Sequence, residues 1–298
     1  MNQTLTAISG VEVGHWTDPE AQTGVTVMTF PEPNVAAAEV RGGAPGTREV
    51  ALLAPGNRVE TIQAIVFAGG SAFGLSAADG VVRQLEADGR GHQAAGHRIP
   101  IVPAAILFDL LRGDGTVRPG PEEGVAAYRS RSTDPVESGA VGAGTGATVS
   151  TWRGAAAVSA GGLGSSTASA GAGNVGALAV VNAVGDIFSL RGEPLTGGPH
   201  EPGPPTVEPP HAENTTLVCL ATDVRLSRVE LGRIVVRAHD ALGACIRPAH
   251  TRYDGDVVFA VACGDEHGDV EAVGEAAFVA VGRAIEAAIR AVRGESRR

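Results

Sequence analysis

Three polar segments interrupt the apolar patterns of this 298-residue chain, and their residue types suit acyl-transfer chemistry. Asn214-Thr215-Thr216 opens a β-rich run, and Asp254-Gly255-Asp256 precedes another. Asn182 lies inside the apolar run 177–184, where an amide without a partner would be unfavourable unless it had a function. A hydroxyl can act as a nucleophile, and a side-chain amide can stabilise the oxyanion of acyl transfer. If 254–256 is extended, both carboxylates share one face, because alternate strand side chains point the same way.

Each segment also has a purely structural interpretation. Asn214-Thr215-Thr216 can simply begin a strand, and it matches the N-x-T acceptor of N-glycosylation. Asp-Gly is a common turn signal, and an asparagine at the end of a strand often bonds to the backbone. The first ten residues lack the charged start, apolar core and cleavage site of a secretory signal, which argues against glycosylation. The residues alone leave these alternatives open.

The charge composition excludes several function classes. All 23 basic residues are arginine, so Schiff-base, P-loop and Ser-Lys mechanisms that need a lysine are impossible, and the only amine of the uncut chain is on Met1. The net charge is −10 and the arginines are scattered, which disfavours nucleic acid and membrane partners and favours small molecules. The eight histidines form no HExxH or paired spacing, and no GxSxG is present. We therefore expect no metal, no cofactor and no conventional α/β-hydrolase triad.

The elements that would position these segments follow from turn and periodicity signals. A β-meander over 4–41 ends in a glycine-rich corner at 41–48. Later elements are predicted as a strand at 64–68, a glycine turn at 69–74, a helix at 76–87, a strand at 99–102 and a polar connection at 113–137. The glycine turn lacks the GxGxxG spacing of a nucleotide-binding loop.

Two glycine-rich blocks, 138–148 and 159–166, lead into an apolar strand at 176–186. Their small residues allow either close packing of backbones or access of a substrate to backbone N–H groups. A linker at 191–213 then holds 7 of the 18 prolines and ends at Asn214. We expect it to be solvated and extended.

After the linker, a compact β-α-β-α unit is predicted, with strands at 215–224 and 257–263 and amphipathic helices at 226–244 and 270–293. Ser227 and Glu230 have the spacing of a capping box. Thr215 would therefore occupy the start of a strand, immediately after a flexible segment.

Two features bear on the compartment. The uncharged stretch 154–185 is 32 residues long, but polar residues and glycines interrupt it too often for a membrane helix. The three cysteines, Cys219, Cys245 and Cys263, lie in apolar runs without CxxC spacing, as expected of buried thiols in a reducing cytoplasm. We therefore predict a cytoplasmic protein.

The segments 214–217, 221–223 and 253–260 together resemble the P1 (S58) peptidase family, which includes L-aminopeptidase/D-esterases, β-peptidyl aminopeptidases and nylon-oligomer hydrolases. Upstream, the similarity extends through 41–49, 67–80, 102–109, 142–149, 161–164 and 181–186. The resemblance implies an αββα four-layer sandwich of α/β class that forms a single domain over 1–298. It also implies self-cleavage at Asn214-Thr215 into chains 1–214 and 215–298, and a homotetramer of processed protomers.

The same resemblance implies a role for each candidate residue. Thr215 would be the nucleophile of an amide hydrolase acting on short peptides, amino-acid amides or ω-amino-acid oligomers. Its new α-amine, with an ordinary pKa of about 7.7 to 8.0, suits a general base near neutrality. Asp254 would contact Thr215, Asp256 would orient Asp254 or the ammonium, and Asn182 would stabilise the oxyanion. Candidates for substrate or oxyanion contacts are Gly144, Thr145, Gly161 and Gly162.

One departure from the family pattern keeps two alternatives open. Many relatives carry a lysine next to the glycine-rich blocks, whereas this chain has Ala160 and Ser150-Thr151 there. Either an arginine replaces it, or the α-amine works unaided, or processing is weak. If processing fails because the lysine is missing, the chain would be an uncleaved, degenerate homologue with a binding role. A further alternative is an acyltransferase of related fold, resembling the ornithine acetyltransferases.

Overall fold

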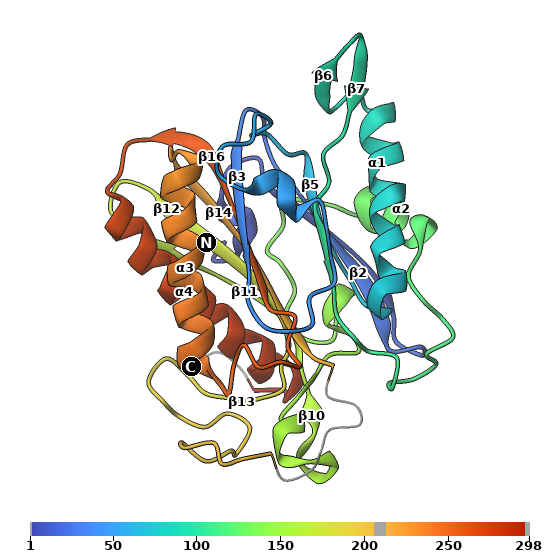
Figure 1. The fold of residues 1–298 in the computed structure, drawn as a ribbon, viewed down its shortest axis with the longest axis vertical. Helices are drawn as coiled ribbons and strands as arrows, with labels where there is room; N and C mark the ends of the chain where they lie inside the picture. The colour runs from blue at the N-terminus through green and yellow to red at the C-terminus, as the bar shows by residue number, and fades with distance from the viewer. Residues whose placement is uncertain (1, 206–212, 296–298) are drawn as a thin grey trace.

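Two five-stranded sheets face each other in the computed structural model, which describes residues 2–205 and 213–295 (Figure 1). The first sheet has the order β1 (Glu12–Asp18), β2 (Thr23–Thr29), β5 (Ala64–Ala68), β8 (Ala104–Ile106) and β4 (Thr47–Arg48). The second has the order β11 (Gly162–Ser169), β12 (Asn174–Asn182), β14 (Thr215–Val224), β16 (Val257–Glu266) and β3 (Val35–Val40). Both sheets are mixed, because β5 pairs with β8 and β14 pairs with β16 in parallel, whereas the other pairs are antiparallel.

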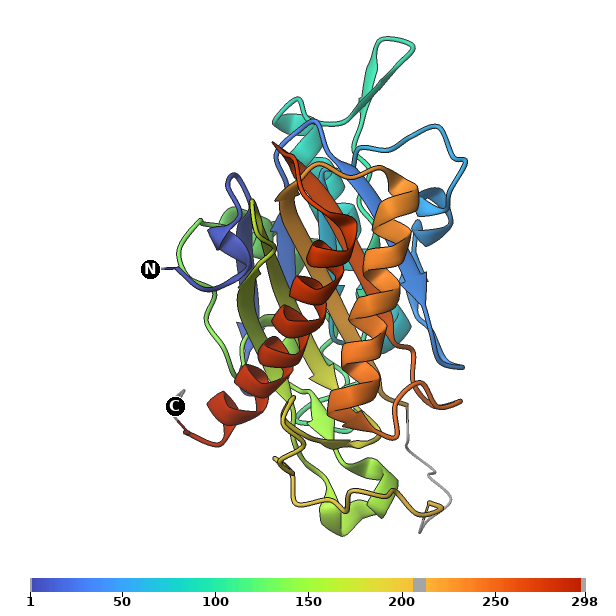
Figure 2. The same ribbon diagram turned by 90° about the vertical axis from the view of Figure 1, so that its left-hand side faces the viewer.

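Helices cover the outer face of each sheet. Helices α1 (Ala77–Ala87) and α2 (Pro121–Arg129) pack on the first sheet, and α3 (Arg228–Cys245) and α4 (Val270–Val292) cover the second (Figure 2). Strand β14 shows how the sequence builds these layers. Leu217 and Cys219 face the core between the sheets, whereas Val218 and Leu220 face the helices, because strand side chains alternate. The predicted αββα sandwich is confirmed.

Most strand and helix predictions agree closely with the structure, but two were wrong. The predicted polar connection at 113–137 contains α2, which begins with Pro121 at its first turn, and Glu123 accepts the N–H of Gly120 at its start. The strand predicted at 99–102 is displaced to β8, after Pro103. Residues 97–99 instead form β7 (His97–Ile99), which pairs with β6 (His92–Ala94) in a hairpin outside both sheets.

The remaining elements are short. Strand β9 (Thr148–Val149) pairs with β10 (Ser159–Ala160), and β13 (Asp186–Ile187) pairs with β15 (Ile246–Arg247). Both pairs lie at one end of the sandwich, the lower end in Figure 1. The 3₁₀ helices are η1 (Leu5–Ala7), η2 (Val50–Leu53), η3 (Ser71–Ser76), η4 (Gly142–Gly144), η5 (Thr151–Arg153) and η6 (Ala155–Ala157).

The proline-rich linker is described up to residue 205 and again at 213, and its remaining residues lie outside the described part of the chain. Its first part is less solvated than expected. Leu195 is buried, the Arg153 guanidinium donates to the Thr196 carbonyl at 3.3 Å, and the Trp152 indole donates to the Gly203 carbonyl at 2.8 Å. The segment that contains η5 thus holds this half of the linker against the protein.

In the part of the chain that the structure describes, no helix combines the length and apolar character needed to cross a membrane.

Candidate active site

Three neighbouring strands of the second sheet bring the predicted catalytic residues together at one end of that sheet. Asn182 ends β12 and pairs directly with Thr215, which begins the antiparallel strand β14. Strand β16 runs parallel to β14, so the residues that precede β16, including Asp254 and Asp256, lie at the same end of the sheet as Thr215. An isolated bridge between Asn214 and Asp254 extends this pairing beyond the strands.

The Asn214-Thr215 peptide is buried and held on several sides. The Thr215 hydroxyl donates to the Asn214 carbonyl oxygen at 2.6 Å, and the Gly255 N–H donates to the same oxygen at 2.9 Å. The Asn214 N–H donates to the Tyr253 carbonyl at 3.1 Å. Thr151 donates its hydroxyl to the Asn214 side-chain oxygen at 3.0 Å. The carbonyl carbon of Asn214 therefore has a hydroxyl beside it and a backbone donor on its oxygen.

Asp254 is a buried carboxyl with three donors. Its Oδ2 accepts the N–H and the hydroxyl of Thr251 at 2.8 and 2.7 Å, and its Oδ1 accepts the Val184 N–H at 3.3 Å. Burial, and then the charge of Asp256, raise the pKa of Asp254 to about 6. This carboxyl can therefore gain and lose a proton close to neutral pH.

Asp256 is equally buried, and its contacts differ from those of Asp254. Its Oδ1 accepts the N–H of Thr216 at 2.7 Å. Its Oδ2 accepts the His250 ring nitrogen Nδ1 at 2.7 Å and the His250 backbone N–H at 3.2 Å. Over residues 2–205 and 213–295, no arginine forms an ion pair with either carboxylate, so an arginine does not replace the missing lysine here.

The glycine-rich corner at 41–48 holds the Asp-Gly-Asp loop in place. Arg41 and Ala44 donate their backbone N–H groups to carbonyl oxygens of residues 256 and 254, at 2.7 and 2.9 Å. Gly42 lies between them with a φ of +100°, and a Cβ there would lie 2.3 Å from the Asp254 carbonyl oxygen. Only glycine combines that conformation with so close an approach.

Asn182 is bonded within the protein, and it links two further segments to the site. Its Oδ1 accepts the Thr148 N–H at 2.8 Å, and its Nδ2 donates to the Phe108 carbonyl at 3.4 Å. The second bond is long, so Nδ2 is the weakly held donor of this amide.

The other candidate donors are bonded within the protein in this structure. Gly144, Thr145 and Gly161 donate their N–H groups to the carbonyl oxygens of Val141, Gly142 and Ala147, at 2.9, 3.1 and 2.8 Å respectively. Gly162 is part of β11 and pairs with Val181. A Cβ at Gly161 would lie 2.1 Å from the Val181 carbonyl oxygen, which places this block in close packing with β12 beside Asn182.

Sequence reasoning missed four contributors to the site: Thr151, His250, Thr251 and the N–H of Gly255. Thr151 is at one of the positions where the missing lysine was noted from the sequence, and it contacts Asn214, the residue before the predicted cleavage site. The pair His250-Thr251 donates to both carboxylates. Its only sequence signal is two polar residues just before the Asp-Gly-Asp segment.

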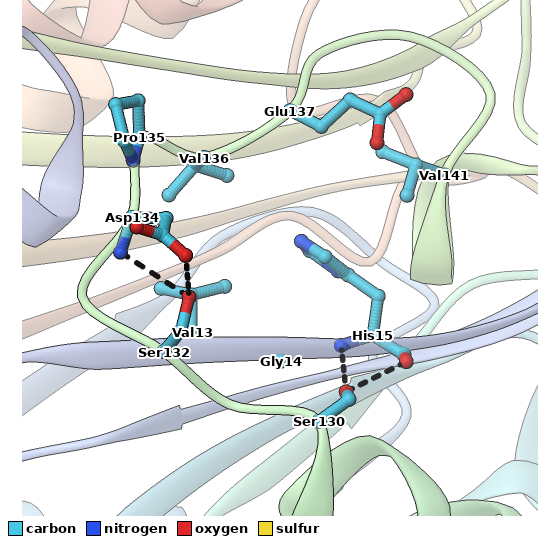
Figure 3. Close-up of a pocket in the computed structure, with 10 residues that line it drawn as sticks. All are labelled: Val13, Gly14, His15, Ser130, Ser132, Asp134, Pro135, Val136, Glu137 and Val141. Atoms are coloured by element: carbon cyan, nitrogen blue, oxygen red, sulfur yellow. Dashed lines mark hydrogen bonds between the residues drawn. The ribbon is translucent and has the colours of Figure 1, made fainter.

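A separate surface pocket of about 290 Å³ contains none of these residues. Figure 3 shows that His15 points into it from β1, opposite residues 134–137, and that Ser130 bonds the His15 backbone. Burial lowers the pKa of His15 to about 4. No group of three or more His, Cys, Asp or Glu side chains that could hold a metal occurs among the described residues.

Two solved structures share this architecture over nearly the whole chain. The L-aminopeptidase D-Ala-esterase/amidase of Ochrobactrum anthropi has a TM-score of 0.77 at 21% identity, covering 96% of this chain and 85% of that one. The β-aminopeptidase of a Burkholderia species has a TM-score of 0.75 at 21% identity, covering 97% and 86%. The first is described as a new variant among the Ntn hydrolase fold, and this chain has that Ntn-hydrolase-like fold.

The chain belongs to peptidase family S58, whose model matches residues 3–294. It is 41% identical over 295 residues to an uncharacterized aminopeptidase of Mycobacterium leprae, covering 88% of this chain and 78% of the relative. It is 30% identical over 278 residues to the 6-aminohexanoate-oligomer endohydrolase of Paenarthrobacter ureafaciens, covering 85% and 72%. The predicted family is confirmed, and the chain is a hydrolase of the aminopeptidase type.

Proposed function

We propose that this chain cleaves its own Asn214-Thr215 bond and then works as an N-terminal-threonine amide hydrolase. The observation that carries the proposal is the buried Thr215 hydroxyl, 2.6 Å from the Asn214 carbonyl oxygen, with the Gly255 N–H on that same oxygen. A nucleophile and a donor on the developing oxyanion are the two groups that acyl transfer needs.

In the first step, Thr215 Oγ1 attacks the Asn214 carbonyl carbon and the peptide C–N bond breaks. The hydroxyl proton passes to the departing nitrogen, which becomes the Thr215 α-amine, and Asn214 is left as an ester on Oγ1. Water then hydrolyses the ester to the Asn214 carboxylate and the free hydroxyl. Asp254, with its pKa near 6, is ionised above that pH and is the nearby group suited to relay the proton.

In turnover, Thr215 attacks the amide carbonyl of a substrate and forms an acyl-enzyme, while its own α-amine acts as the base. Asn182 Nδ2 exchanges its long bond to the Phe108 carbonyl for the substrate oxyanion. The substrates are short peptides, amino-acid amides or ω-amino-acid oligomers. The names of the relatives support this class, since they include aminopeptidases and a 6-aminohexanoate-oligomer endohydrolase.

The intact mass of freshly purified protein tests the first step. The expected result is two chains, 1–214 and 215–298, that remain together under native conditions. The variant Thr215→Ala should stay a single chain, whereas Thr215→Ser keeps a hydroxyl and should still be cut. Cleavage of Thr215→Ala at the same bond would contradict the proposal.

A slow amide substrate tests the second step. The chain 215–298 should gain the mass of the acyl group, and an amine-reactive label should block the reaction, because Thr215 carries the only amine that cleavage creates in a lysine-free chain. A protein that carries the label on the Thr215 amine and remains active would exclude the α-amine as base. Cytoplasmic location and a homotetramer of processed protomers remain part of the proposal, and light scattering of the cut protein tests the tetramer.

A further inference from the structure

We propose that His250 is a positioning residue for this reaction: its ring fixes Asp256 as the charged member of the carboxylate pair and leaves Asp254 as the member that exchanges a proton. The inference rests on the proposed function and assigns a role to a side chain that does not touch Thr215. It also explains how two neighbouring buried carboxyl groups can differ in protonation in a chain that has no lysine to pair with them.

The hydrogen bonds to the two carboxylates single out this ring. Among the described residues, Asp254 and Asp256 together accept six hydrogen bonds. Five come from backbone N–H groups or the Thr251 hydroxyl, which cannot change their protonation near neutral pH. The sixth comes from His250 Nδ1, 2.7 Å from Asp256 Oδ2. Among the described residues, His250 is thus the one partner of the pair whose role as donor depends on which ring nitrogen carries the proton.

The surroundings of the ring determine which nitrogen carries its proton. His250 Nε2 is buried and has no hydrogen-bond partner, so a proton there would lack an acceptor. The ring therefore keeps its proton on Nδ1, where it donates to Asp256. A donor on an ionised carboxylate favours the ionised form, and the resulting charge on Asp256 is one cause of the raised pKa of Asp254.

Among the described residues around His250, no side chain supplies another donor or a charge that could take its place on Asp256. From α3, His239 meets the ring edge-on at 4.9 Å between centroids, and burial lowers the pKa of His239 to about 3, so it is neutral. Directly after β3, Arg41 is paired with Glu39 at 2.8 Å. Along its own loop, Arg252 stacks on Tyr253.

The backbone of His250 is itself under constraint. Its φ is +56°, in the left-handed region that residues other than glycine adopt uncommonly and in which asparagine, aspartate and histidine are the most frequent. That conformation places its ring and its N–H on the same Asp256 oxygen, at 2.7 and 3.2 Å. Strain of this kind persists where the surrounding contacts require it.

This conformation provides two informative substitutions. His250→Gly accepts the left-handed backbone and removes the ring donor. His250→Asn also tolerates this φ, and its side-chain N–H group replaces that of Nδ1. The pair separates the loss of the donor from the loss of the fold.

The experiment measures the side-chain carboxyl ¹³C shifts of Asp254 and Asp256 against pH in the full-length Thr215→Ala chain, where no cleavage intervenes. The two signals are assigned with Asp254→Asn and Asp256→Asn. With His250 present, the shared proton should reside on Asp254. In His250→Gly the titration midpoint of Asp254 should fall and that of Asp256 should rise, each by about one pH unit, because Asp256 has lost a donor to its ionised form. His250→Asn should restore the original midpoints.

In the chain that retains Thr215, His250→Gly should slow self-cleavage at pH 7 about tenfold or more, and His250→Asn should recover most of the rate. Unchanged midpoints in His250→Gly would overturn the role of His250, even if the protein cuts itself normally. A wild-type chain that neither cuts itself nor hydrolyses amides would overturn the proposed function, while the exchange of midpoints would still be measurable.

Discussion

The raised pKa of Asp254 predicts a pH dependence of stability that is independent of catalysis. In the uncut Thr215→Ala chain, the folded state keeps the Asp254 proton up to about pH 6, whereas the unfolded state loses it near the ordinary value of 3.8. Between these pH values the folded state binds more protons than the unfolded state, so stability falls as the pH rises and levels off above pH 6.

The size of the effect follows from the same two values. One pH unit corresponds to about 1.4 kcal/mol, so the rise from 3.8 to about 6 lowers the free energy of unfolding by about 3 kcal/mol in all, of which about 2.5 kcal/mol falls between pH 4 and pH 7. Asp109, another buried carboxyl with a raised pKa, acts in the same direction, so the comparison must isolate Asp254.

Chemical denaturation of Thr215→Ala with and without Asp254→Asn at pH 4, 5, 6 and 7 isolates it. Asp109 contributes equally to both chains and cancels. The asparagine amide at position 254 meets the donors that now bond the Asp254 carboxylate. This changes the free energy of unfolding by an amount that does not vary with pH. Asp265→Asn at an exposed position controls for the removal of one carboxylate. The stability of the Asp254 chain relative to its asparagine variant should decline by about 2.5 kcal/mol from pH 4 to pH 7. A difference that stays constant would refute the assignment of Asp254 as the titrating group.

Two further substitutions, each with a control, test contacts at the site, and a third tests a buried guanidinium at the start of α3. Thr151→Val removes the donor to the Asn214 side chain and should slow self-cleavage about tenfold, whereas Thr151→Ser should not, by intact mass against time. Gly255→Ala should abolish self-cleavage, because its Cβ would lie 2.4 Å from a backbone carbonyl oxygen and 2.9 Å from the nucleophilic hydroxyl. Gly232→Ala, at a helical position with free space, should still cleave and gain up to about 1 kcal/mol of stability. Arg228→Met removes donors to five carbonyl oxygens at residues 36 and 52–59 and should lower the free energy of unfolding by about 3 kcal/mol in urea. An unchanged denaturation midpoint would contradict the structural role of this buried guanidinium.

The sequence was most informative where a long segment has a regular pattern of apolar and polar residues. The strand at 215–224 and the helix at 270–293 follow from alternation and the 3.6-residue pattern, and the structure places them within one residue of those bounds. The joint position of Thr215 and Asn182 was not readable in that way. It depends on the register of β12 against β14, which no local pattern encodes.

Side-chain contacts between segments that are distant in sequence could not be predicted from the sequence either. Thr151 is 63 residues from Asn214 in sequence, and nothing in its own segment indicates that its hydroxyl reaches that amide. Asn182 could be recognised as a polar residue in an apolar strand, yet its partners at Thr148 and Phe108 come from the first glycine-rich block and from the loop after β8. Such contacts are set by the packing of the two sheets.

The absence of lysine now has a specific consequence for the site. In the described part of the uncut chain, no arginine pairs with the buried carboxylates Asp254 and Asp256, and burial together with the charge of Asp256 lets Asp254 hold its proton up to about pH 6. The proposed self-cleavage would change that balance, because it would create an ammonium at Thr215, next to the Thr216 N–H that already donates to Asp256. A cation at that position favours ionisation of both carboxyls. The proposed reaction therefore begins with a carboxyl that titrates near neutrality and ends with a site whose one new positive charge is a product of the reaction itself.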